Sequence, residues 1–545
     1  MNNSNPVAYF CAEYGFDTSL PLYAGGLGVL AGDTVRAAAD ANEPFVAVGL
    51  LYRGKGMIQA ITEAGLQEEQ DYTFDPVSHG LEHVYVDDQP LFIKVHMSTS
   101  EVWLRCWKKT FSDNVTLYLL DSDTDQNDPP QRQITHRLYH GTDESQLQQM
   151  FLLGVGGVKL LNTLGIHPRL YHVNEGRPAF LIWQLIRQYM DLHAVDYESA
   201  RKLAINKIVY TNHTLVAAGN KVFSMDTLKS YCEYYAQKMR ISTEYLLSPG
   251  WSDDGSGFSV TRFALNSSSK SNGVSQLHTN LSQKQWPEYN WCNVTNGVHL
   301  PTWQDQQMSV QSAPLALWQR HLELKHQLST YVHHKTGYQY DSTQLVLGWA
   351  RRLAGYKQLP LLFSDLDRIK AILHHQERPV YLLIAGKVHQ GDTAGKEMLQ
   401  AVINHMQTEL SGQVLFIPNY NLEIAQQLTR GVDVWLNTPE YGKEACGTSG
   451  MKALANGVLP LAVADGWSAE ILPDSAGGWT IDHTQTANSL YTLLEQLVVP
   501  LYYQRDQNDL PSAWADRMQI AVNLAHQISA KRMFTEYQTN LYNLE

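Results

Sequence analysis

The sequence predicts an α/β protein with doubly wound parallel sheets, most simply arranged as two domains that face each other. Two observations support this prediction. Short apolar runs of strand length alternate with helical patterns in both halves of the chain, and such alternation is typical of parallel strands joined by crossover helices. The length of 545 residues also exceeds what one hydrophobic core usually holds.

The first half opens with a strand, a glycine-rich turn and a helix. "VAYFCAEY" predicts the strand, "YAGGLGVLAGD" (23–33) the turn, and "DTVRAAADAN" a helix that ends before the next strand, "PFVAVGLLY". Further on, "RLYHVN" and "INKIVYTNHT" predict buried strands that end in polar residues. Open α/β sheets bind their ligands beyond the carboxyl ends of the strands, so this edge is the expected ligand side.

The second half repeats this organisation. Five apolar runs predict strands at 344–350, 380–386, 413–420, 432–437 and 459–465, with helical patterns between several of them. The segment "LPTWQDQQMSVQSAP" interrupts the pattern before a long helix. We therefore expect domains over 1–305 and 306–510, followed by C-terminal helices over 511–545 that pack back toward the first domain.

Composition argues against several classes of protein. The formal charge of −13 disfavours a nucleic-acid-binding surface, and no apolar run is long enough to span a bilayer. The N-terminal residues contain no secretory pattern. The five cysteines are scattered without a C-x-x-C pair, so neither a disulfide framework nor a metal site is expected, and the cytoplasm is the expected compartment.

The segment "EACGTSGMKALANG" (444–457) predicts an anion site. A glycine-flanked turn that opens a helix offers free backbone N–H groups, and Thr448 and Ser449 add hydroxyl donors. Lys452 can neutralise a bound phosphate, or it can form a Schiff base with a carbonyl cofactor. A glycine-rich turn beside a surface lysine is the alternative interpretation.

A second cationic segment, "GWARRLAGYK" (348–357), follows a predicted strand. Its three cations, Arg351, Arg352 and Lys357, suit a highly charged anion. The alternative is a solvated, basic start of a helix, which the acidic overall charge and the preceding buried strand make less favourable.

Polar residues at other strand ends are weaker candidates. The turn at 23–33 is not G-x-G-x-x-G, so it gives little support for dinucleotide binding, although its glycines permit close approach of a sugar or phosphate. His213 is either a general base or a hydrogen-bonding structural residue. Trp303, beside Asn296, is a stacking surface or a core residue. The carboxylates Glu13, Glu175 and Glu444 show no spacing typical of a glycosidase pair.

Taken together, these segments resemble the α-glucan (glycogen, starch, maltodextrin) phosphorylase family, and most closely its short, unregulated bacterial and archaeal type. The likeness runs from about residue 8 to the end and includes "AEYGFDTSLPLYAGGLGVLAGD", "SNGVSQLH", "VTNGVHLPTW", "ARRLAGYK", "AGKVHQGD", "DVWLNTPEYGKEACGTSGMKALANG" and "SAKRMFTEY". The Ser-rich stretch around 266–283, whose composition is typical of a linker, is thereby expected to be ordered.

The resemblance implies a fold, a reaction and a cofactor. The fold is the GT-B arrangement, with two facing Rossmann-like domains and an active site in the cleft. The reaction is retaining cleavage of a terminal α-1,4-glucosyl unit by orthophosphate, which yields glucose 1-phosphate. The cofactor is pyridoxal 5′-phosphate, whose own phosphate relays a proton. Family members are often dimers, so a homodimer is expected.

The resemblance also assigns roles to single residues. Lys452 matches the Schiff-base lysine, while Gly447, Thr448 and Ser449 match the cradle of the cofactor phosphate, with Arg351, Tyr420 and Trp303 beside the cofactor. Arg352 and Lys357 match ligands of the substrate phosphate. The residues expected around the sugar are Gly25, Gly26, Gly28, His213 (through its carbonyl), Asn296, Glu444 and Cys446, with Glu175 and Arg177 on the acceptor side.

Two departures from the family pattern bear on function. Cys446 replaces a more usual serine, which is tolerable because the family uses the backbone N–H there. Arg177 stands where a histidine is usual. Two other functions therefore stay open: a GT-B transferase with a nucleotide-sugar donor and no cofactor on Lys452, and a non-catalytic glucan-binding homologue.

Overall fold

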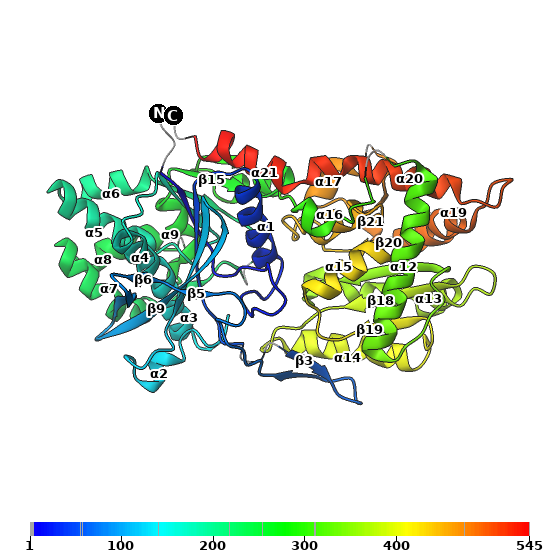
Figure 1. Ribbon diagram of the computed structural model, residues 1–545, viewed down its shortest axis with the longest axis horizontal. Helices are drawn as coiled ribbons and strands as arrows, with labels where there is room; N and C mark the ends of the chain where they lie inside the picture. Colours follow the sequence, from blue (N-terminus) through cyan, green and yellow to red (C-terminus); the bar gives the residue numbers. More distant parts are fainter. Residues whose placement is uncertain are drawn as a thin grey trace.

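The computed structural model describes residues 5–54, 56, 58–139, 141–216, 219–252, 254–309, 312–473 and 475–543. Its described strands form two large sheets, one in each half of the chain (Figure 1). Both are largely parallel and covered by helices, as the alternation of apolar runs predicts. The first sheet lies in an apolar core around β1 (Val7–Phe10). The second lies between two apolar clusters, both of which include residues of β17 (Leu345–Ala350).

The first sheet has ten strands. Its parallel part runs in the order β16 (Trp291–Asn293), β15 (Lys270–Gly273), β12 (Ile208–Thr211), β11 (Leu170–Asn174), β1, β2 (Phe45–Leu50) and β10 (Val115–Asp121). It continues antiparallel through β9 (Ser100–Ser112), which also pairs with β8 (Phe92–Met97) and β5 (Glu82–His83). The predicted strands are confirmed, but the antiparallel edge was not predicted.

Two segments of this half, the glycine-rich turn and the Ser-rich stretch, can be compared with their predicted structure. Helix α1 (Gly26–Asp40) begins inside the predicted glycine turn rather than after it. The Ser-rich stretch forms strand β15 and helix α10 (Gln276–Gln285), so its expected order is confirmed and the linker composition is misleading. One of its serines caps a helix: Ser275 Oγ accepts a hydrogen bond from the His278 backbone N–H at the start of α10.

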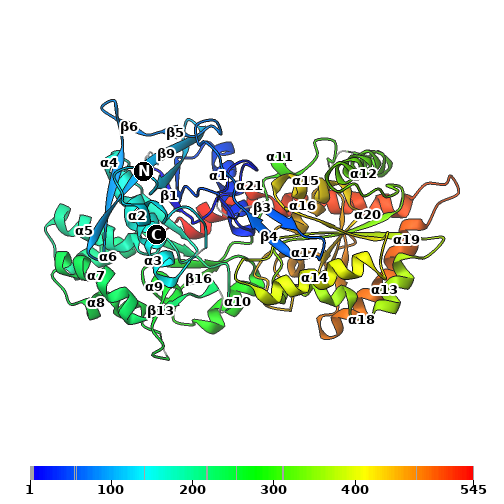
Figure 2. The same cartoon turned by 90° about the horizontal axis from the view of Figure 1, so that it is seen from below.

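The second sheet has six parallel strands in the order β19 (Val414–Ile417), β18 (Val380–Ala385), β17, β20 (Val434–Asn437), β21 (Leu459–Val463) and β22 (Trp479–Ile481). All five predicted strands are present, and β22 is additional. Helices α12 (Pro314–Thr336) and α15 (Leu422–Gly431) cover one face, while α13 (Leu366–Leu373), α14 (Thr393–Gln407) and α18 (Thr486–Leu493) cover the other (Figure 2).

The last helix returns to the first half of the chain. Helix α21 (Ala530–Glu536) packs on α1 (Figure 1). The Phe534 and Phe45 rings lie with centroids 5.8 Å apart, and the Tyr542 hydroxyl lies 2.9 Å from His172 Nδ1. Residues of this segment are therefore part of the core around β1.

A hairpin from the first half reaches the second. Strands β3 (Ile58–Ile61) and β4 (Gln67–Gln70) lie beside α14 (Figure 1). The buried Gln59 amide donates to the Gly386 carbonyl at 2.9 Å, and Gln67 bonds the Val388 carbonyl and N–H at 2.9 and 3.0 Å. The hairpin thus holds the backbone just beyond β18, at the carboxyl edge of the second sheet.

No helix among the described residues is both long enough and apolar enough to cross a membrane. Within the same residues, no cluster of three or more histidine, cysteine, aspartate or glutamate side chains is arranged to hold a metal ion.

Candidate active site

Lys452 is a buried amine. It lies on the short helix α16 (Ser449–Leu454) between β20 and β21, and 5% of it is exposed. Its Nζ lies 3.9 Å from the centroid of the Trp303 ring, a favourable place for a cation. Burial lowers the pKa of the amine to about 8, although Asp33 acts to raise it. The surface-lysine interpretation is therefore wrong, and Lys452 has the properties of a reactive amine.

The turn before Lys452 is tightly packed. A side chain at Gly447 would collide with the carboxylate of Glu444, so any larger residue would have to displace that carboxylate. Ser449 Oγ accepts a hydrogen bond from Trp435 Nε1 at 3.2 Å, which leaves its own O–H free to donate elsewhere. Thr448 is 8% exposed. The turn brings its small residues within reach of any group held at Lys452.

Two of the three predicted cations are held by one carboxylate. Lys357 Nζ lies 2.8 Å and Arg351 Nη1 3.2 Å from Glu444, and all three side chains are buried. Burial alone would raise the pKa of Glu444, but Lys357 and then Arg351 outweigh it, so the pKa is lowered and the carboxylate stays charged. The basic-helix interpretation is wrong for these two cations.

Arg352 differs from its neighbours. Its side chain is exposed, and it makes no hydrogen bond or ion pair with any residue that the structure describes. Arg351 also keeps a buried donor, Nε, without a partner among the described residues. The cluster therefore has donor capacity left for an anion.

Residues of the first half complete the surroundings of this turn. Asn296 Nδ2 donates to the Cys446 carbonyl at 3.1 Å, while Asn296 Oδ1 is buried without a partner among the described residues. The Cys446 thiol is buried, which raises its pKa. Burial also raises the pKa of Tyr420 to about 12, and Arg351 nearby acts against that rise.

The glycine turn is held by Glu13. The backbone N–H groups of Ala24 and Gly25 donate to Glu13 Oε2 at 2.8 and 3.1 Å. A β-carbon built on Gly25 or Gly26 would meet no described atom within 4 Å, so this side of the turn faces open space. Gly28 has a different role, because a β-carbon there would lie 2.6 Å from Tyr23 Cβ.

Arg177 is connected to this turn through Tyr139. The Tyr139 hydroxyl donates to Glu13 Oε1 at 2.5 Å, and the Arg177 guanidinium lies 4.4 Å from the centroid of the Tyr139 ring. Arg177 also donates to Gln146 at 3.1 Å, while its buried Nη1 has no partner among the described residues. Arg177 therefore supports the wall of the site and keeps one donor for a ligand.

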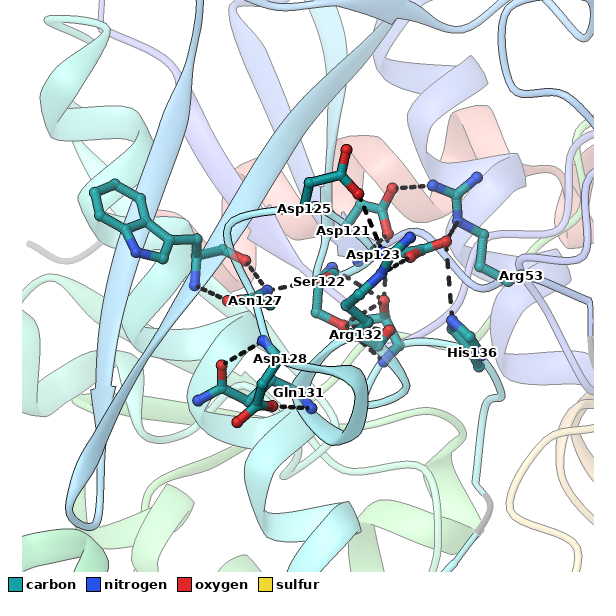
Figure 3. Close-up of polar contacts among 12 residues, drawn as sticks. Arg53, Asp121, Ser122, Asp123, Asp125, Asn127, Asp128, Gln131, Arg132 and His136 are labelled. Carbon is teal, nitrogen blue, oxygen red and sulfur yellow. Dashed lines mark hydrogen bonds and ion pairs between the residues drawn. The ribbon is translucent and has the colours of Figure 1, made fainter.

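The segment that leads to Tyr139 is fixed by an ion-pair network, drawn in Figure 3. Asp121, buried at the end of β10, pairs with Arg53 at 2.5 Å, and Asp123 pairs with Arg132 at 2.8 Å and with His136 at 3.9 Å. Asp121 and Asp123 each have a cation beside them, so the network holds this part of the backbone in place.

His213 is a weak base in this structure. Its Nε2 lies 2.6 Å from Asn174 Oδ1, an acceptor, so this nitrogen carries the proton. Burial, followed by the nearby His278, lowers the pKa of the ring to about 3. A ring with so low a pKa accepts a proton poorly near pH 7, which favours its structural interpretation over the general-base one. The backbone N–H of His213 donates to Glu175 Oε2 at 2.9 Å.

A cavity lies beside these residues. It has a volume of about 420 Å³ and is lined by Leu215, Val216, Leu281, Gln285, Gly442 and Lys443. These lining residues come from both halves of the chain: Leu215 and Val216 follow His213, Gly442 and Lys443 precede Glu444, and Leu281 and Gln285 belong to α10. The candidate site residues thus surround a junction between the two sheets.

Comparison with known proteins identifies the family. The description of the family model that matches residues 305–542 is "Carbohydrate phosphorylase". A maltodextrin phosphorylase from Thermococcus litoralis is 33% identical over 99% of this chain and 70% of its own length. The chain belongs to the carbohydrate phosphorylase family. A glycogen phosphorylase from Mycobacterium tuberculosis strain H37Rv is 32% identical over 98% of this chain and 70% of its own length. Another, from Aquifex aeolicus, is 30% identical over 99% of this chain and 86% of its own length.

The resemblance predicted from sequence is thus confirmed, and the residues can be viewed as those of a phosphorylase. The structure brings Lys452, Trp303, Asn296, Cys446 and Glu444 to one junction. Sequence reasoning missed Asp33, and it considered Glu13 only as one of three carboxylates without the spacing of a glycosidase pair. The roles of both acids depend on contacts made by folding.

Glu175 makes the stability of this phosphorylase depend on pH. Burial raises the pKa of its carboxyl to about 7, against hydrogen bonds from His213 and others. The folded chain then binds a proton that the unfolded chain has released, so stability falls as pH rises from about 4.5 to 7.

We expect Glu175→Gln, which imitates the protonated group, to match the wild type at pH 5 and to exceed its free energy of unfolding by about 2 kcal/mol at pH 8. Denaturant unfolding at both pH values measures this. The exposed Glu288→Gln serves as the control, and an equal effect of both variants would contradict the assignment.

Proposed function

We propose that this protein is a retaining α-glucan phosphorylase, which uses orthophosphate to release glucose 1-phosphate from the end of a maltodextrin or glycogen chain. The observation that supports this most directly is the buried Lys452 amine beside a cluster of cations. The printed names of the relatives, maltodextrin phosphorylase and glycogen phosphorylase, support the substrate class.

The proposal includes a GT-B arrangement with domains at 1–305 and 306–510 and C-terminal helices at 511–545. The two sheets and their separate cores support this division. A cytoplasmic location and a homodimer are further parts of the proposal; the first rests on the scattered cysteines and the second on the family resemblance.

The residues around Lys452 fit pyridoxal 5′-phosphate. Lys452 would hold the cofactor through its amine, with Trp303 and Tyr420 beside it and Gly447, Thr448, Ser449 and Arg351 around its phosphate. Three features support this fit: the lowered pKa of the amine, the buried Nε of Arg351 without a partner among the described residues, and the close packing of Gly447 on Glu444. When bound, the cofactor supplies a phosphate that exchanges a proton with the substrate phosphate.

The chain's own residues bind and orient the reactants. Arg352 and Lys357 would grip the substrate phosphate, where cations offset the repulsion between two phosphates held close together. Gly25 and Gly26 would present the open side of their turn to the phosphate and sugar. Asn296, Glu444 and the His213 carbonyl would hydrogen-bond the glucosyl unit, and Arg177 and Glu175 would face the acceptor.

The deciding experiment incubates the protein with maltodextrin and orthophosphate and assays glucose 1-phosphate. Phosphate-dependent release supports the proposal. Transfer from a nucleotide sugar by a protein without near-ultraviolet cofactor absorbance would favour a GT-B transferase. Maltodextrin binding without any product would favour a non-catalytic homologue. That alternative is kept open by Arg177, which stands where the family usually has a histidine.

A further inference from the structure

Asp33 is a buried acid that the proposed reaction does not use. It lies on α1 with 1% of its side chain exposed. Both of its oxygens accept from Trp303 Nε1, at 3.1 and 2.9 Å, and the backbone N–H of His299 also donates to it. Arg36, one turn further along the helix, lies 3.8 Å away. A carboxylate with this many donors is oriented firmly.

Trp303 is held at its indole by Asp33 and at its backbone carbonyl by residues from the second half of the chain. Its indole is bonded to Asp33, while its carbonyl accepts from Asn456 Nδ2 at 3.0 Å and from Arg430 Nε at 3.1 Å. Asn456 Nδ2 also donates to the carbonyl of Lys452 at 2.8 Å. The ring is thereby fixed with its face 3.9 Å from the Lys452 amine.

The charges around the amine come mainly from Asp33. Among the described residues, Asp33 is the charged group that acts on Lys452, and its negative charge favours the protonated form of the amine. Arg36 faces Asp33 and is itself near Asp17 and Asp40, and His299 pairs with Asp40 at 2.8 Å. Burial opposes the charge on Lys452, so Asp33 and the Trp303 face are what stabilise its cation.

We propose that Asp33 is a positioning residue that holds the Trp303 ring against Lys452 and sets the pH range in which this amine condenses with an aldehyde. The inference rests on the proposed function, because the aldehyde is that of the cofactor. The amine must first release its proton. Its nitrogen then bonds to the aldehyde carbon, and the carbonyl oxygen leaves as water, with no change of oxidation state.

The test measures labelling of Lys452 rather than catalysis. Full-length protein freed of cofactor is treated with pyridoxal 5′-phosphate across pH 5 to 10 and then with borohydride, and the fraction labelled at Lys452 is read by peptide mass spectrometry. In Asp33→Asn, we expect the midpoint of initial labelling to move about 1 pH unit lower, because an attractive charge is lost while the size is kept.

Matched variants make the result specific. Asp40→Asn, an exposed acid on the same helix, should leave the midpoint in place. Trp303→Phe keeps an aromatic face but removes the indole N–H, and it should also lower the midpoint, which tests the link if Asp33→Asn fails to fold. A wild-type midpoint in both Asp33→Asn and Trp303→Phe would overturn the inference. No label on wild-type Lys452 at any pH would instead overturn the proposed cofactor.

Discussion

Replacing Lys452 by alanine will reduce glucose 1-phosphate release to background and abolish stable retention of pyridoxal 5′-phosphate together. Lys452 is the residue that would anchor the cofactor. Its amine is buried beside the turn, and burial lowers its pKa to about 8. The measurements are phosphorolysis, near-ultraviolet absorbance after dialysis, and borohydride labelling of the peptide that contains residue 452.

Two controls separate chemistry from folding. Lys452→Arg keeps a cation over Trp303 but removes the primary amine, so it should stay folded and inactive. Lys335→Ala removes an exposed lysine of α12 that pairs with Glu423 at 3.9 Å, and it should leave both activity and label unchanged. Cofactor retention by Lys452→Ala at the wild-type level would contradict the role given to this residue.

Replacing Arg352 by alanine should lower kcat/KM for phosphate by about 10²- to 10³-fold, the effect of removing one electrostatic clamp on a developing charge. The midpoint of thermal unfolding should hardly move, because the exposed side chain makes no ion pair with the described residues. Steady-state kinetics with varied phosphate and a thermal scan measure the two effects.

Lys357→Ala provides the contrast to Arg352→Ala. Lys357 is buried and pairs with Glu444 at 2.8 Å, so its removal leaves a buried carboxylate with one cation fewer and should lower stability as well as activity. Near-normal phosphorolysis in Arg352→Ala would show that the substrate phosphate is bound elsewhere.

Much of the fold follows from the periodicity of the sequence. The parallel strands of the second sheet are continuous apolar runs, because both faces are covered by helices, and such runs are easily found. Strand β9 was missed because its apolar residues alternate with polar ones on a half-buried edge. The β3–β4 hairpin was missed because it is stabilised by glutamine contacts with loops more than 300 residues away.

The site was predicted in part for similar reasons. Cations and glycines at strand ends are visible locally, so Lys452, Arg351 and the turn at 447–449 could be found. Their pairing could not, because Glu444 and Trp303 acquire their partners through folding. The sequence also gives no indication that Arg352 stays exposed while Arg351 is buried beside it.

The return of α21 to the first sheet has a consequence for biosynthesis. Phe534, Tyr537 and Tyr542 are buried in the core that begins with β1, yet they follow the whole second sheet in the sequence. Nascent chains usually fold their N-terminal unit first. Here that unit keeps apolar surface uncovered until the second sheet and α21 have been translated, so we expect the first half to fold stably only after α21 has been made.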